Sequence, residues 1–594
     1  MRHLADFEEV WLHDFEFHQP EGERPHPLCL VARELWSGRV IRMWRDELFR
    51  WIQCPFRTDA QALAVAYFAS AEMSCFLALD WAMPVNLVDL YAEFSLITSG
   101  LPAPCGRGLL GACTYFHIPA GVSELYKDEM RDLAQRGGDY SFEERADLLD
   151  YCETDVSALA RLLPAMQRLI EAPPTMSPGD HHKALGQALL RGEYVKAVAR
   201  MEYRGVPIDT EALTRLRASW QRIELALIDR VDQDFGVYQE GAFVASAFER
   251  YLGAHGVAWP RTLTGALKLD RDTFKDISQT YPALAPLHEL RATLAQMREW
   301  SLPVGSDGRN RCLLSPFGAK TGRNTPSASG FIFALATWLR GLVKPPQGRA
   351  IAYLDYEQQE FGIAAYLSGD KNMMAAYRSG DPYLAFAKQA GAVPSDATKE
   401  SHGAVRDQFK TCALGIQYAM GCEALASRIN DSLSRARELL RLHRETYPDY
   451  WRWSEACVNY AMLYGHLTAT YGWRVHVSPE TRPTSLRNFL LQSNGAEMLR
   501  LACILASELR LPVCCPIHDA LLTEDSVAGV DGTVADVAQA MIEASTKILP
   551  GFPLRVEAKV YRWPDRFADK RGERMWKTVW GLMDGKEASS LSQK

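Results

Sequence analysis

The chain has 594 residues, more than one hydrophobic core usually holds, so several packed units are expected. Hydrophobic residues make up 47% and charged residues 23%, as in globular proteins, and no apolar run approaches the roughly 18–20 residues that span a bilayer. The formal net charge is −7, so a surface for nucleic acid must come from a local surplus of cations rather than from the whole chain.

Residues 1–172 alternate segments typical of strands and helices, which predicts an α/β layer domain. The expected strands cover 10–17 and 28–36, and the expected helices cover 59–73 and 145–171. A Pro-rich linker follows at 171–182, and residues 183–300 have an almost wholly helical pattern. Short strands and long helices then alternate, and the polar segment 585–594 is expected to be disordered.

Thirteen cysteines form no CxxC pair, and residues 1–17 lack the positive start and apolar run of a secretory signal. Both features favour a reducing, cytoplasmic compartment, with Cys514 and Cys515 as small buried residues of a strand. Residues 301–350 have seven basic residues against one acid, a surplus that suits nucleic acid. The cations of this basic window are Arg309, Arg311, Lys320, Arg323, Arg340, Lys344 and Arg349.

Two aspartates stand where a carboxylate could bind a cation. Residues 351–356, IAYLDY, have the pattern of a short apolar strand that ends in Asp355, directly before a helix. Residues 511–525, LPVCCPIHDALLTED, have the pattern of two strands around His518-Asp519, as in a tight hairpin with an acid at its tip. Either acid alone would more often be a helix cap or a turn residue.

A third segment, residues 401–421, predicts a helix with a four-residue repeat. Arg406, Lys410, Leu414 and Tyr418 recur on one stripe of this helix. The two cations would neutralise the phosphates of a nucleoside triphosphate, while the apolar and aromatic residues would border its sugar and base. A solvated helix face is the alternative for this segment by itself.

In this order, the three segments resemble motifs A, B and C of the family A DNA polymerases, the class of bacterial DNA polymerase I and its phage relatives. Residues 355–370 are similar to DYSQIELRxxAHLSxD, residues 406–419 to RxxxKxxxFGxxYG, and residues 518–520 to HDE. Residues 198–209, VARMEYRGVPID, are similar to the MExxGVxVD segment at the base of the thumb.

Other residues resemble the DNA-binding parts of the same family. Residues 321–323, Thr-Gly-Arg, look like the element that lines the primer–template path, and residues 487–492 look like the helix that touches the minor groove near the primer end. The DNA-binding residues implied by the resemblance are Arg323, Arg487, Asn488, Gln492 and His518.

The resemblance implies a right-hand polymerase, with an α+β palm and a helical thumb and fingers, behind an RNase H-like α/β exonuclease domain. The expected boundaries are 1–172 for the exonuclease, 183–310 for the thumb, 311–370 and 486–575 for the palm, 371–485 for the fingers, and 576–594 for a C-terminal tail.

Nucleotidyl transfer explains why the two aspartates must be acids. A primer 3′-hydroxyl is a poor nucleophile at neutral pH, and two Mg²⁺ ions, for which Mn²⁺ can substitute, would activate it and stabilise the leaving pyrophosphate. Asp355 and Asp519 would bridge the ions, with the backbone carbonyl of Tyr356 as a further ligand. The resemblance places Glu360 where it blocks a ribose 2′-hydroxyl, which implies dNTP substrates, and Gln358 among the dNTP-binding residues.

Three residues depart from the family pattern. Leu414 stands where an aromatic is usual, Ala419 replaces the second glycine of motif B, and Ala520 replaces the third acid of motif C. The last change removes a side chain that supports the primer terminus. None removes a metal-bridging acid, so activity is expected to persist.

The N-terminal region has a second set of acids. The segment HDFEF puts Asp14 and Glu16 on one face of a strand, and Tyr151 and Asp155 lie four residues apart on one face of a helix. These patterns resemble the DEDDy proofreading exonucleases, in which four acids hold two metal ions and the tyrosine orients the attacking water.

The third acid of that set is open. Glu72, in the stretch YFASAEM, is the preferred candidate, and Asp80 and Asp89 are the alternatives. If Asp89 is the ligand, Glu72 is a surface acid.

The preferred function is a template-directed DNA polymerase with an attached 3′→5′ proofreading exonuclease, a monomer acting on primer–template DNA with dNTPs. The compact size and the lack of a 5′-nuclease segment favour a phage replicative enzyme, with phage accessory proteins as further partners and the host cytoplasm as its location. Some phage relatives copy genomes that contain 2-aminoadenine, and no single residue decides whether this chain does. The alternatives are an exonuclease whose polymerase half only binds DNA, and a non-enzymatic nucleic-acid-binding scaffold.

Overall fold

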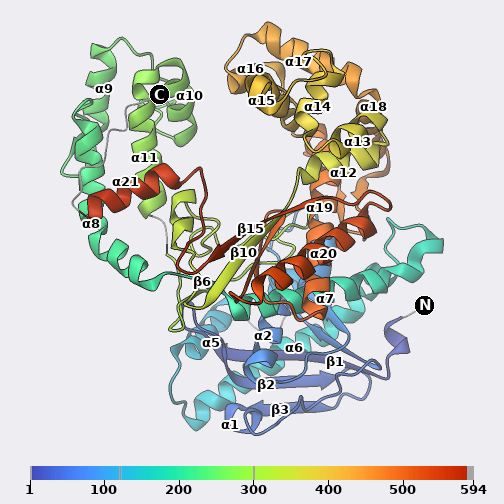
Figure 1. Cartoon of the computed structure of the whole chain (residues 1–594). Coiled ribbons are helices and arrows are strands. Elements are labelled where there is room, and N and C mark those ends of the chain that lie inside the picture. Colours follow the sequence, from blue (N-terminus) through green and yellow to red (C-terminus); the bar gives the residue numbers. More distant parts are fainter. Residues whose placement is uncertain (1–2, 120, 122, 299–300, 585–594) are drawn as a thin grey trace. The chain divides into compact units, whose positions relative to one another are not determined.

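The computed structural model describes residues 3–119, 121, 123–298 and 301–584. Its contacts divide the chain, coloured by sequence in Figure 1, into two compact units. Unit 1 comprises Met1–Gly205, Leu313–Thr325 and Ala352–Val560, and unit 2 comprises Val206–Cys312, Pro326–Ile351 and Tyr561–Lys594. The segment 585–594, for which disorder is expected, lies outside the described residues.

The N-terminal part of unit 1 is built on a five-stranded sheet in the order β3-β2-β1-β4-β5. β1 (Glu9–His18) pairs antiparallel with β2 (His26–Glu34) and parallel with β4 (Ala62–Ala66), and β3 (Val40–Trp44) and β5 (Leu87–Asp89) form the edges. The strands expected at 10–17 and 28–36 are confirmed.

The helix expected at 59–73 is wrong over its first half. Residues 62–66 form β4, and α2 (Ser70–Ala78) begins only after them. Every residue of β4 is buried, because this strand lies inside the sheet and is covered on both faces. A strand of this kind has a continuous apolar run instead of an alternating pattern, which sequence periodicity does not separate from a buried helix.

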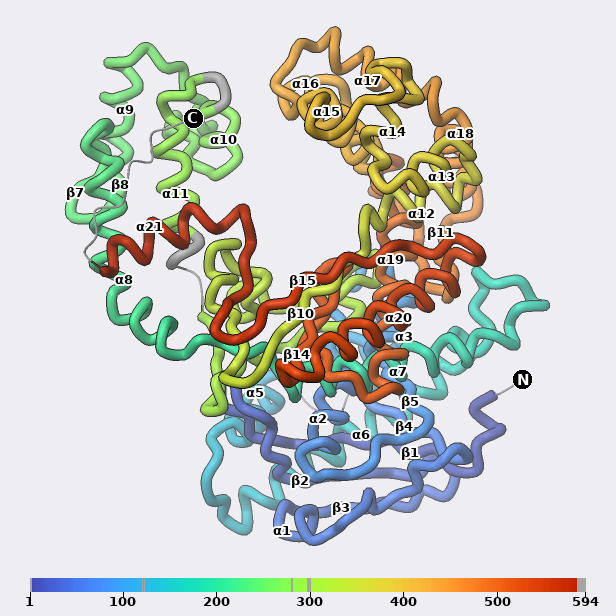
Figure 2. The backbone as a smooth tube through the Cα atoms, viewed as in Figure 1, coloured from blue at the N-terminus to red at the C-terminus, as the bar shows by residue number. Residues whose placement is uncertain are grey.

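Helices cover this sheet and complete its core. α6 (Phe142–Glu171), which confirms the helix expected at 145–171, packs against β1 and β2, and its course can be followed in Figure 2. Its start is fixed by Ser141, whose Oγ accepts a hydrogen bond from Glu144 N. Leu148, Cys152 and Leu159 lie on its buried face. The shorter elements are η1 (Leu4–Asp6), α1 (Arg45–Leu48), α3 (Leu90–Ile97), α4 (Leu109–Tyr115) and α5 (Glu124–Arg136).

α7 (Ala184–Arg204) connects this layer with the remainder of unit 1. It follows η2 (Pro178–Lys183) and packs against α2 and β5 as well as against α19 and β13. A buried pair reinforces the junction, with Arg191 Nε donating to Glu93 Oε1 at 2.6 Å and Nη2 donating to Oε2 at 2.7 Å. α7 therefore belongs to unit 1, although the expected thumb begins at residue 183.

A second sheet, mostly in unit 1, has the order β13-β14-β10-β15. β13 (Val513–Ile517) and β14 (Ala520–Ser526) form a hairpin, β10 (Arg349–Tyr356) lies beside β14, and β15 (Val556–Arg562) is the other edge. α19 (Pro483–Glu508) and α20 (Val530–Ile548) pack against each other, and they also contact β13 and β14, respectively. As expected, Cys514 and Cys515 are buried in β13.

A helical segment links β10 to this hairpin. It comprises α12 (Gln359–Ser368), α13 (Lys371–Arg378), α14 (Pro382–Gln389), α15 (Lys399–Gln417), α16 (Cys422–Ile429), α17 (Leu433–Thr446), α18 (Pro448–Tyr464) and the hairpin of β11 (His466–Thr468) and β12 (Arg474–His476). Asp370 and Asp381 begin α13 and α14 by accepting hydrogen bonds from the first backbone amides of each helix.

The buried His443 in α17 should make this segment sensitive to acid. Its Nδ1 accepts a hydrogen bond from Trp451 Nε1 at 3.1 Å, and burial lowers the pKa of His443 to about 3. Because the unfolded chain binds this proton near pH 6.5 and the folded chain does not, stability falls as pH drops below about 6.5. At pH 5 the loss from this group is about 2 kcal/mol relative to pH 7.

Urea unfolding at both pH values measures this effect. His443→Gln keeps an acceptor but cannot be protonated, so its loss of stability between pH 7 and pH 5 should be smaller than that of the native chain by about 2 kcal/mol. His182→Gln, at an exposed position, should leave the loss unchanged. Equal pH dependence in the native chain and His443→Gln would contradict the neutral, buried imidazole.

Unit 2 is mainly helical, as the sequence predicts for residues 183–300. Its helices are α8 (Thr210–Asp232), α9 (Ala245–Ala254), α10 (Arg271–Thr280), α11 (Ala285–Arg298) and α21 (Glu573–Met583), with η3 (Pro282–Leu284) and η4 (Thr337–Leu342). Two short pairs join β6 (Val206–Pro207) to β9 (Arg309–Asn310) and β7 (Tyr238–Gln239) to β8 (Ala242–Phe243). Phe248, Phe274 and Leu287 belong to its core. The tail expected from residue 576 begins inside α21, which packs on α8 and η4.

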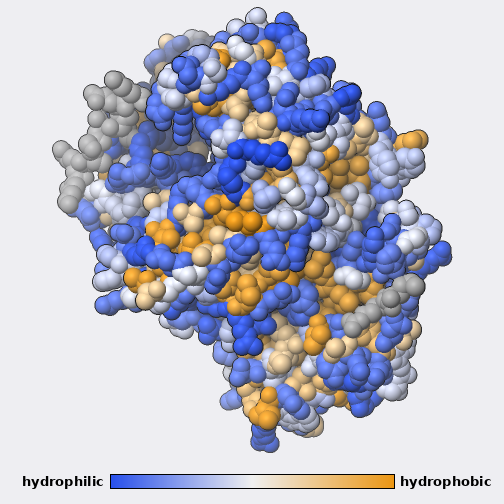
Figure 3. Space-filling model, turned by 45° about the vertical axis from the view of Figure 1, so that its right-hand side comes forward, coloured by the Kyte–Doolittle hydropathy of each residue, from blue (hydrophilic) through white to orange (hydrophobic). Residues whose placement is uncertain are grey.

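On the face in Figure 3, hydrophobic side chains lie in patches between hydrophilic ones. Among the described residues, no helix combines the length and the apolar character that crossing a membrane requires.

Candidate active sites

The second sheet brings Asp355 and Asp519 together. Asp355 is the penultimate residue of β10, and Asp519 lies in the turn between β13 and β14, where His518 adopts a left-handed φ of +54°. Tyr356 N donates to Asp519 O at 3.3 Å, which fixes the end of β10 against this turn. The ring of Tyr356 is buried, and its Oη donates to Met541 O at 2.6 Å.

The two carboxyl groups lie within hydrogen-bonding reach of each other. Burial and then the charge of Asp519 raise the pKa of Asp355 to about 8, and burial raises the pKa of Asp519. Asp355 Oδ1 is buried and has no hydrogen-bond partner among the described residues. Two facing carboxylates with an unsatisfied oxygen favour either a bound proton or a divalent cation at this point.

Glu360 connects three other segments that the sequence singles out. Its Oε1 accepts a hydrogen bond from Tyr418 Oη at 2.8 Å and lies 3.4 Å from Arg323 Nη2. Gln492 on α19 also lies within hydrogen-bonding reach of Tyr418. One polar cluster is therefore formed by Arg323, Glu360, Tyr418 and Gln492. Arg323 was expected to contact DNA, but in this structure it contacts a carboxylate.

The two cations of the expected phosphate-binding stripe on α15 differ in whether they already have an acidic partner. Arg406 Nε donates to Asp381 Oδ2 at 2.5 Å, whereas Lys410 is exposed near the ring of Tyr383. Leu414 is half-buried in the same helix, and Tyr418 follows its last residue as the C-cap. Arg406 would have to exchange Asp381 for a phosphate, while Lys410 is already accessible.

The remaining residues of the expected site take part in contacts within unit 1. Gln358 has a left-handed φ of +48° before α12, and its Oε1 accepts a hydrogen bond from Arg555 Nη2 at 3.0 Å. Arg487 lies over the ring of Trp451, and the neighbouring Asn488 is buried.

The basic window of residues 301–350 is not a free cationic surface. At least four of its seven cations have carboxylate partners, which sequence composition does not reveal. These pairs are Arg311–Asp307 at 2.5 Å, Arg323–Glu360 at 3.4 Å, Arg340–Asp569 at 2.9 Å and Lys344–Asp209 at 3.4 Å.

Two departures from the family pattern have visible consequences. Ala419 adopts a φ of +54°, a left-handed conformation that costs an alanine about 1–2 kcal/mol and a glycine much less. A glycine would therefore suit this position, as in motif B. Ala520 is fully buried at the start of β14, and its methyl side chain puts no carboxylate beside Asp519.

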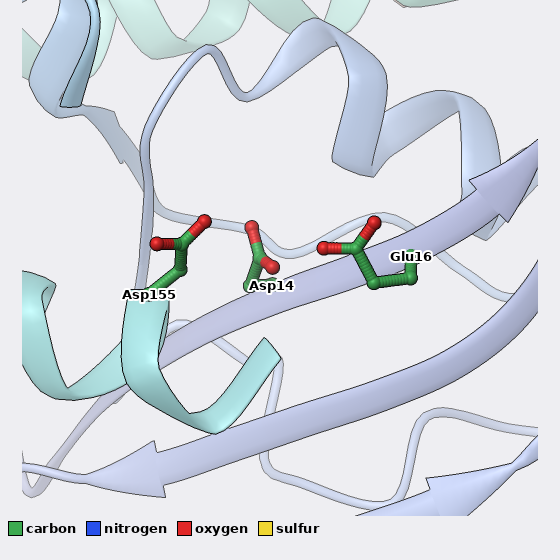
Figure 4. Close-up of side chains that lie close together, drawn as sticks. All are labelled: Asp14, Glu16 and Asp155. Carbon is green, nitrogen blue, oxygen red and sulfur yellow. The ribbon is translucent and has the colours of Figure 1, made fainter. Parts of the chain in front are cut away.

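The N-terminal layer brings a second set of acids together, as Figure 4 shows. Asp14 and Glu16 project from β1 and Asp155 from α6, and one ligand atom of each lies within 4.8 Å of the others. Burial and then the charge of Asp155 raise the pKa of Asp14 to about 8, while burial, followed by the charge of Asp14, raises the pKa of Glu16. Tyr151 lies within hydrogen-bonding reach of Asp155.

The structure separates the three candidates for the remaining acid. Asp89 is the N-cap of α3, and its Oδ1 accepts hydrogen bonds from Tyr91 N and Phe68 N, both at 2.9 Å. Asp80 is exposed after α2. Glu72 is buried, its Oε2 has no hydrogen-bond partner among the described residues, and burial, then the charge of Asp14, raises its pKa. Asp89 Oδ2 is likewise buried without a partner among the described residues, but of the two buried candidates Glu72 is the one on which the charges of Asp14 and Asp155 act.

One residue near this cluster has no counterpart in the sequence analysis. The charge of Lys127, on α5, acts on both Asp14 and Asp155 and lowers their pKa values against the effect of burial. A lysine in the helical stretch SELYKDEMRDLAQR resembles any solvated helix residue, so no signal in the sequence distinguishes it.

Several known DNA polymerases are similar to this chain in sequence. Residues 334–563 match the sequence model described as DNA polymerase family A. The DNA polymerase of Mycobacterium phage D29 is 26% identical over 374 residues, which are 59% of this chain and 59% of that protein. DNA polymerase I of Chloroflexus aurantiacus is 24% identical over 409 residues, 63% of this chain and 42% of that protein. The chain thus spans about half the length of these curated relatives.

A solved structure has the same fold. The "POL domain of Pol1 from M. smegmatis complex with DNA primer-template and dNTP" aligns with a TM-score of 0.70 and 17% identity over 93% of this chain and 95% of that one. The matched segment 334–563 contains both Asp355 and Asp519. Over residues 334–563, less than half of its length, the chain is therefore similar to DNA polymerase family A.

Proposed function

We propose that this chain is a template-directed DNA polymerase that adds dNTPs to the 3′ end of a primer. The observation that supports this most strongly is the meeting of Asp355 and Asp519, from distant parts of the sequence, at one end of the second sheet. Primer–template DNA and dNTPs are the proposed partners, as they are the ligands named for the M. smegmatis structure.

The residues at this end of the sheet fit a pair of divalent cations. Asp355 and Asp519 would hold them through carboxylate oxygens, since hard oxygen ligands are what Mg²⁺ prefers. When bound, the cations would make the 3′-hydroxyl a better nucleophile and stabilise the charge on the leaving pyrophosphate. Lys410 would neutralise the triphosphate, joined by Arg406 once it leaves Asp381. Bases would meet Tyr418 and the polar residues of α19.

Primer extension with Mg²⁺ and dNTPs tests this proposal. The native chain should lengthen a labelled primer in the order that the template dictates. Degradation without extension would favour the alternative of an exonuclease whose polymerase half only binds DNA, and neither activity would favour a binding scaffold. Supplying 2-aminoadenine deoxynucleotide in place of dATP would show whether a modified base is preferred. The phage D29 relative supports a role in phage genome replication.

Glu360 should select deoxyribonucleotides. It lies against Tyr418 at the edge of the proposed nucleotide site, and a ribose 2′-hydroxyl would meet its side chain. Glu360→Ala should therefore raise the use of rNTPs relative to dNTPs by about 10–100-fold, measured as a ratio of kcat/KM values. Tyr418→Phe removes the hydrogen bond and keeps the carboxylate, so its ratio should change much less. An unchanged ratio in Glu360→Ala would count against this role.

A second activity, 3′→5′ exonuclease, is supported by the N-terminal cluster. Asp14, Glu16 and Asp155 converge within 4.8 Å, and Glu72 adds a fourth carboxylate with an unsatisfied oxygen. Such a set suits two divalent cations, and Tyr151 beside Asp155 could orient an attacking water. Degradation of a primer with a mismatched 3′ end, in the absence of dNTPs, tests this activity.

A further inference from the structure

Glu557, on the edge strand β15, lies directly opposite Asp355. Glu357 N donates to Arg555 O at 2.9 Å and Trp563 N donates to Arg349 O at 3.1 Å, so β10 and β15 run antiparallel in a register that is the same at both ends. This register pairs Asp355 with Glu557. Directly opposite residues of an antiparallel pair project from the same face, with Cβ atoms about 4.5–5.5 Å apart.

The electrostatics of Asp355 agree with this placement. The negative charge of Glu557 raises the pKa of Asp355, and the positive charge of Lys559, two residues further along β15, lowers it. Glu557 has its own ion pair with Lys559 at 3.6 Å, but both side chains are more than half exposed. An exposed pair of this kind contributes little stability.

Three acids, Asp519, Asp355 and Glu557, therefore lie at the same end of this sheet, and the charges of the other two act on Asp355. Like charges opposite each other on neighbouring strands destabilise a sheet, and a divalent cation reverses that effect by attracting all three. The neighbouring Ala520 is fully buried and provides no acid. The carboxylate absent from the hairpin is thus available from the strand on the other side of β10.

We propose that Glu557 is a third carboxylate of this centre and helps to hold the divalent cations that Asp355 and Asp519 share. This inference rests on the proposed polymerase function. It explains why the chain can lack an acid at position 520. It also predicts that replacing Glu557 lowers the affinity for the cations but not the stability of the fold.

Mn²⁺ binding, measured by calorimetry without DNA or nucleotide, tests the role of Glu557. All proteins would have Asp14→Asn in common, so that binding at the N-terminal cluster is weakened equally. Glu557→Gln should weaken Mn²⁺ binding by about tenfold or more, and the Mn²⁺ concentration for half-maximal extension should rise to match. Extension should recover at saturating Mn²⁺. The melting temperature without metal should not fall.

Lys559→Gln is the matched control, since it breaks the same ion pair from the other side. If Glu557 holds the cation, loss of the nearby positive charge should leave Mn²⁺ affinity unchanged or higher. A change of less than about threefold in Glu557→Gln, or an equal loss in Lys559→Gln, would overturn the inference. Asp519→Asn distinguishes failure of the proposed function from failure of the role of Glu557. If Asp519→Asn does not weaken Mn²⁺ binding, the proposed function fails. If Asp519→Asn weakens binding and Glu557→Gln does not, only the role of Glu557 fails.

Discussion

Replacing Asp519 with Ala is expected to lower the rate of primer extension by at least about 10³-fold. Asp519 and Asp355 are both largely buried and interact with each other at the end of β10, and neither could hold a cation pair alone. Loss of either acid should therefore remove the activation of the 3′-hydroxyl while leaving the fold in place. Single-turnover extension of a labelled primer, at saturating dNTP and Mg²⁺, measures this rate.

Two further variants make that result specific. Asp519→Asn keeps the shape of the side chain and removes its charge, so it should be nearly as inactive as Asp519→Ala. Asp396→Ala, in an exposed loop after α14, should extend primers at the native rate. Substantial extension by Asp519→Asn would show that the chemistry does not depend on this carboxylate.

Replacing Asp14 with Ala should abolish degradation of the primer, by about 10³-fold or more, and leave extension close to the native rate. Asp14 lies between Asp155 and Glu16 in Figure 4, so it is the acid best placed to contact every cation in the cluster. The polymerase-type acids lie on a different sheet, and no ligand atom is common to the two sites. Parallel assays of degradation and extension on one substrate measure both activities.

The neighbouring acids provide the controls for this second prediction. Glu72→Gln should also lose degradation, because its unsatisfied oxygen faces the cluster. Asp89→Asn should retain it, and because an asparagine Oδ1 can accept the same backbone hydrogen bonds, the cap of α3 should persist. Loss of both activities in Asp14→Ala would contradict separate sites, and loss of degradation in Asp89→Asn alone would return Asp89 to the set of ligands.

The sequence predicted best where chemistry and local pattern coincide. Asp355 was expected at the end of an apolar strand and Asp519 in a hairpin turn, and the structure has them at the end of β10 and between β13 and β14. Tyr151 and Asp155, four residues apart, lie on the inner face of α6 because the same helix also directs Leu148 and Leu159 into the core. Here a functional residue and its apolar neighbours obey one periodicity, which sequence alone reveals.

Contacts between distant segments explain most of what the sequence did not predict. The first half of the expected helix at 59–73 is a strand because its apolar run is covered on both faces by elements elsewhere in the chain. Arg406 matches a phosphate-binding position, yet its partner in this structure is Asp381. The cations of residues 301–350 have partners as remote as Asp569. Charge counted along a sequence does not show which charges are already neutralised.

Strand pairing added information that no single segment contains. Glu557 lies in VEAKVYR, whose alternating polar residues resemble any exposed edge strand. Only its register with β10 puts it opposite Asp355. The choice between Glu72 and Asp89 likewise depends on the fold, which puts Glu72 within reach of the charges of Asp14 and Asp155 and Asp89 at the start of α3.

Anomalous diffraction from crystals soaked in Mn²⁺ tests the central claim most directly. The account predicts Mn²⁺ within about 2.5 Å of carboxylate oxygens from both Asp355 and Asp519, with the two side chains bridging the same ion or ion pair. Mn²⁺ bound at the N-terminal cluster but absent from these two aspartates, or carboxyl groups too far apart to share an ion, would contradict it.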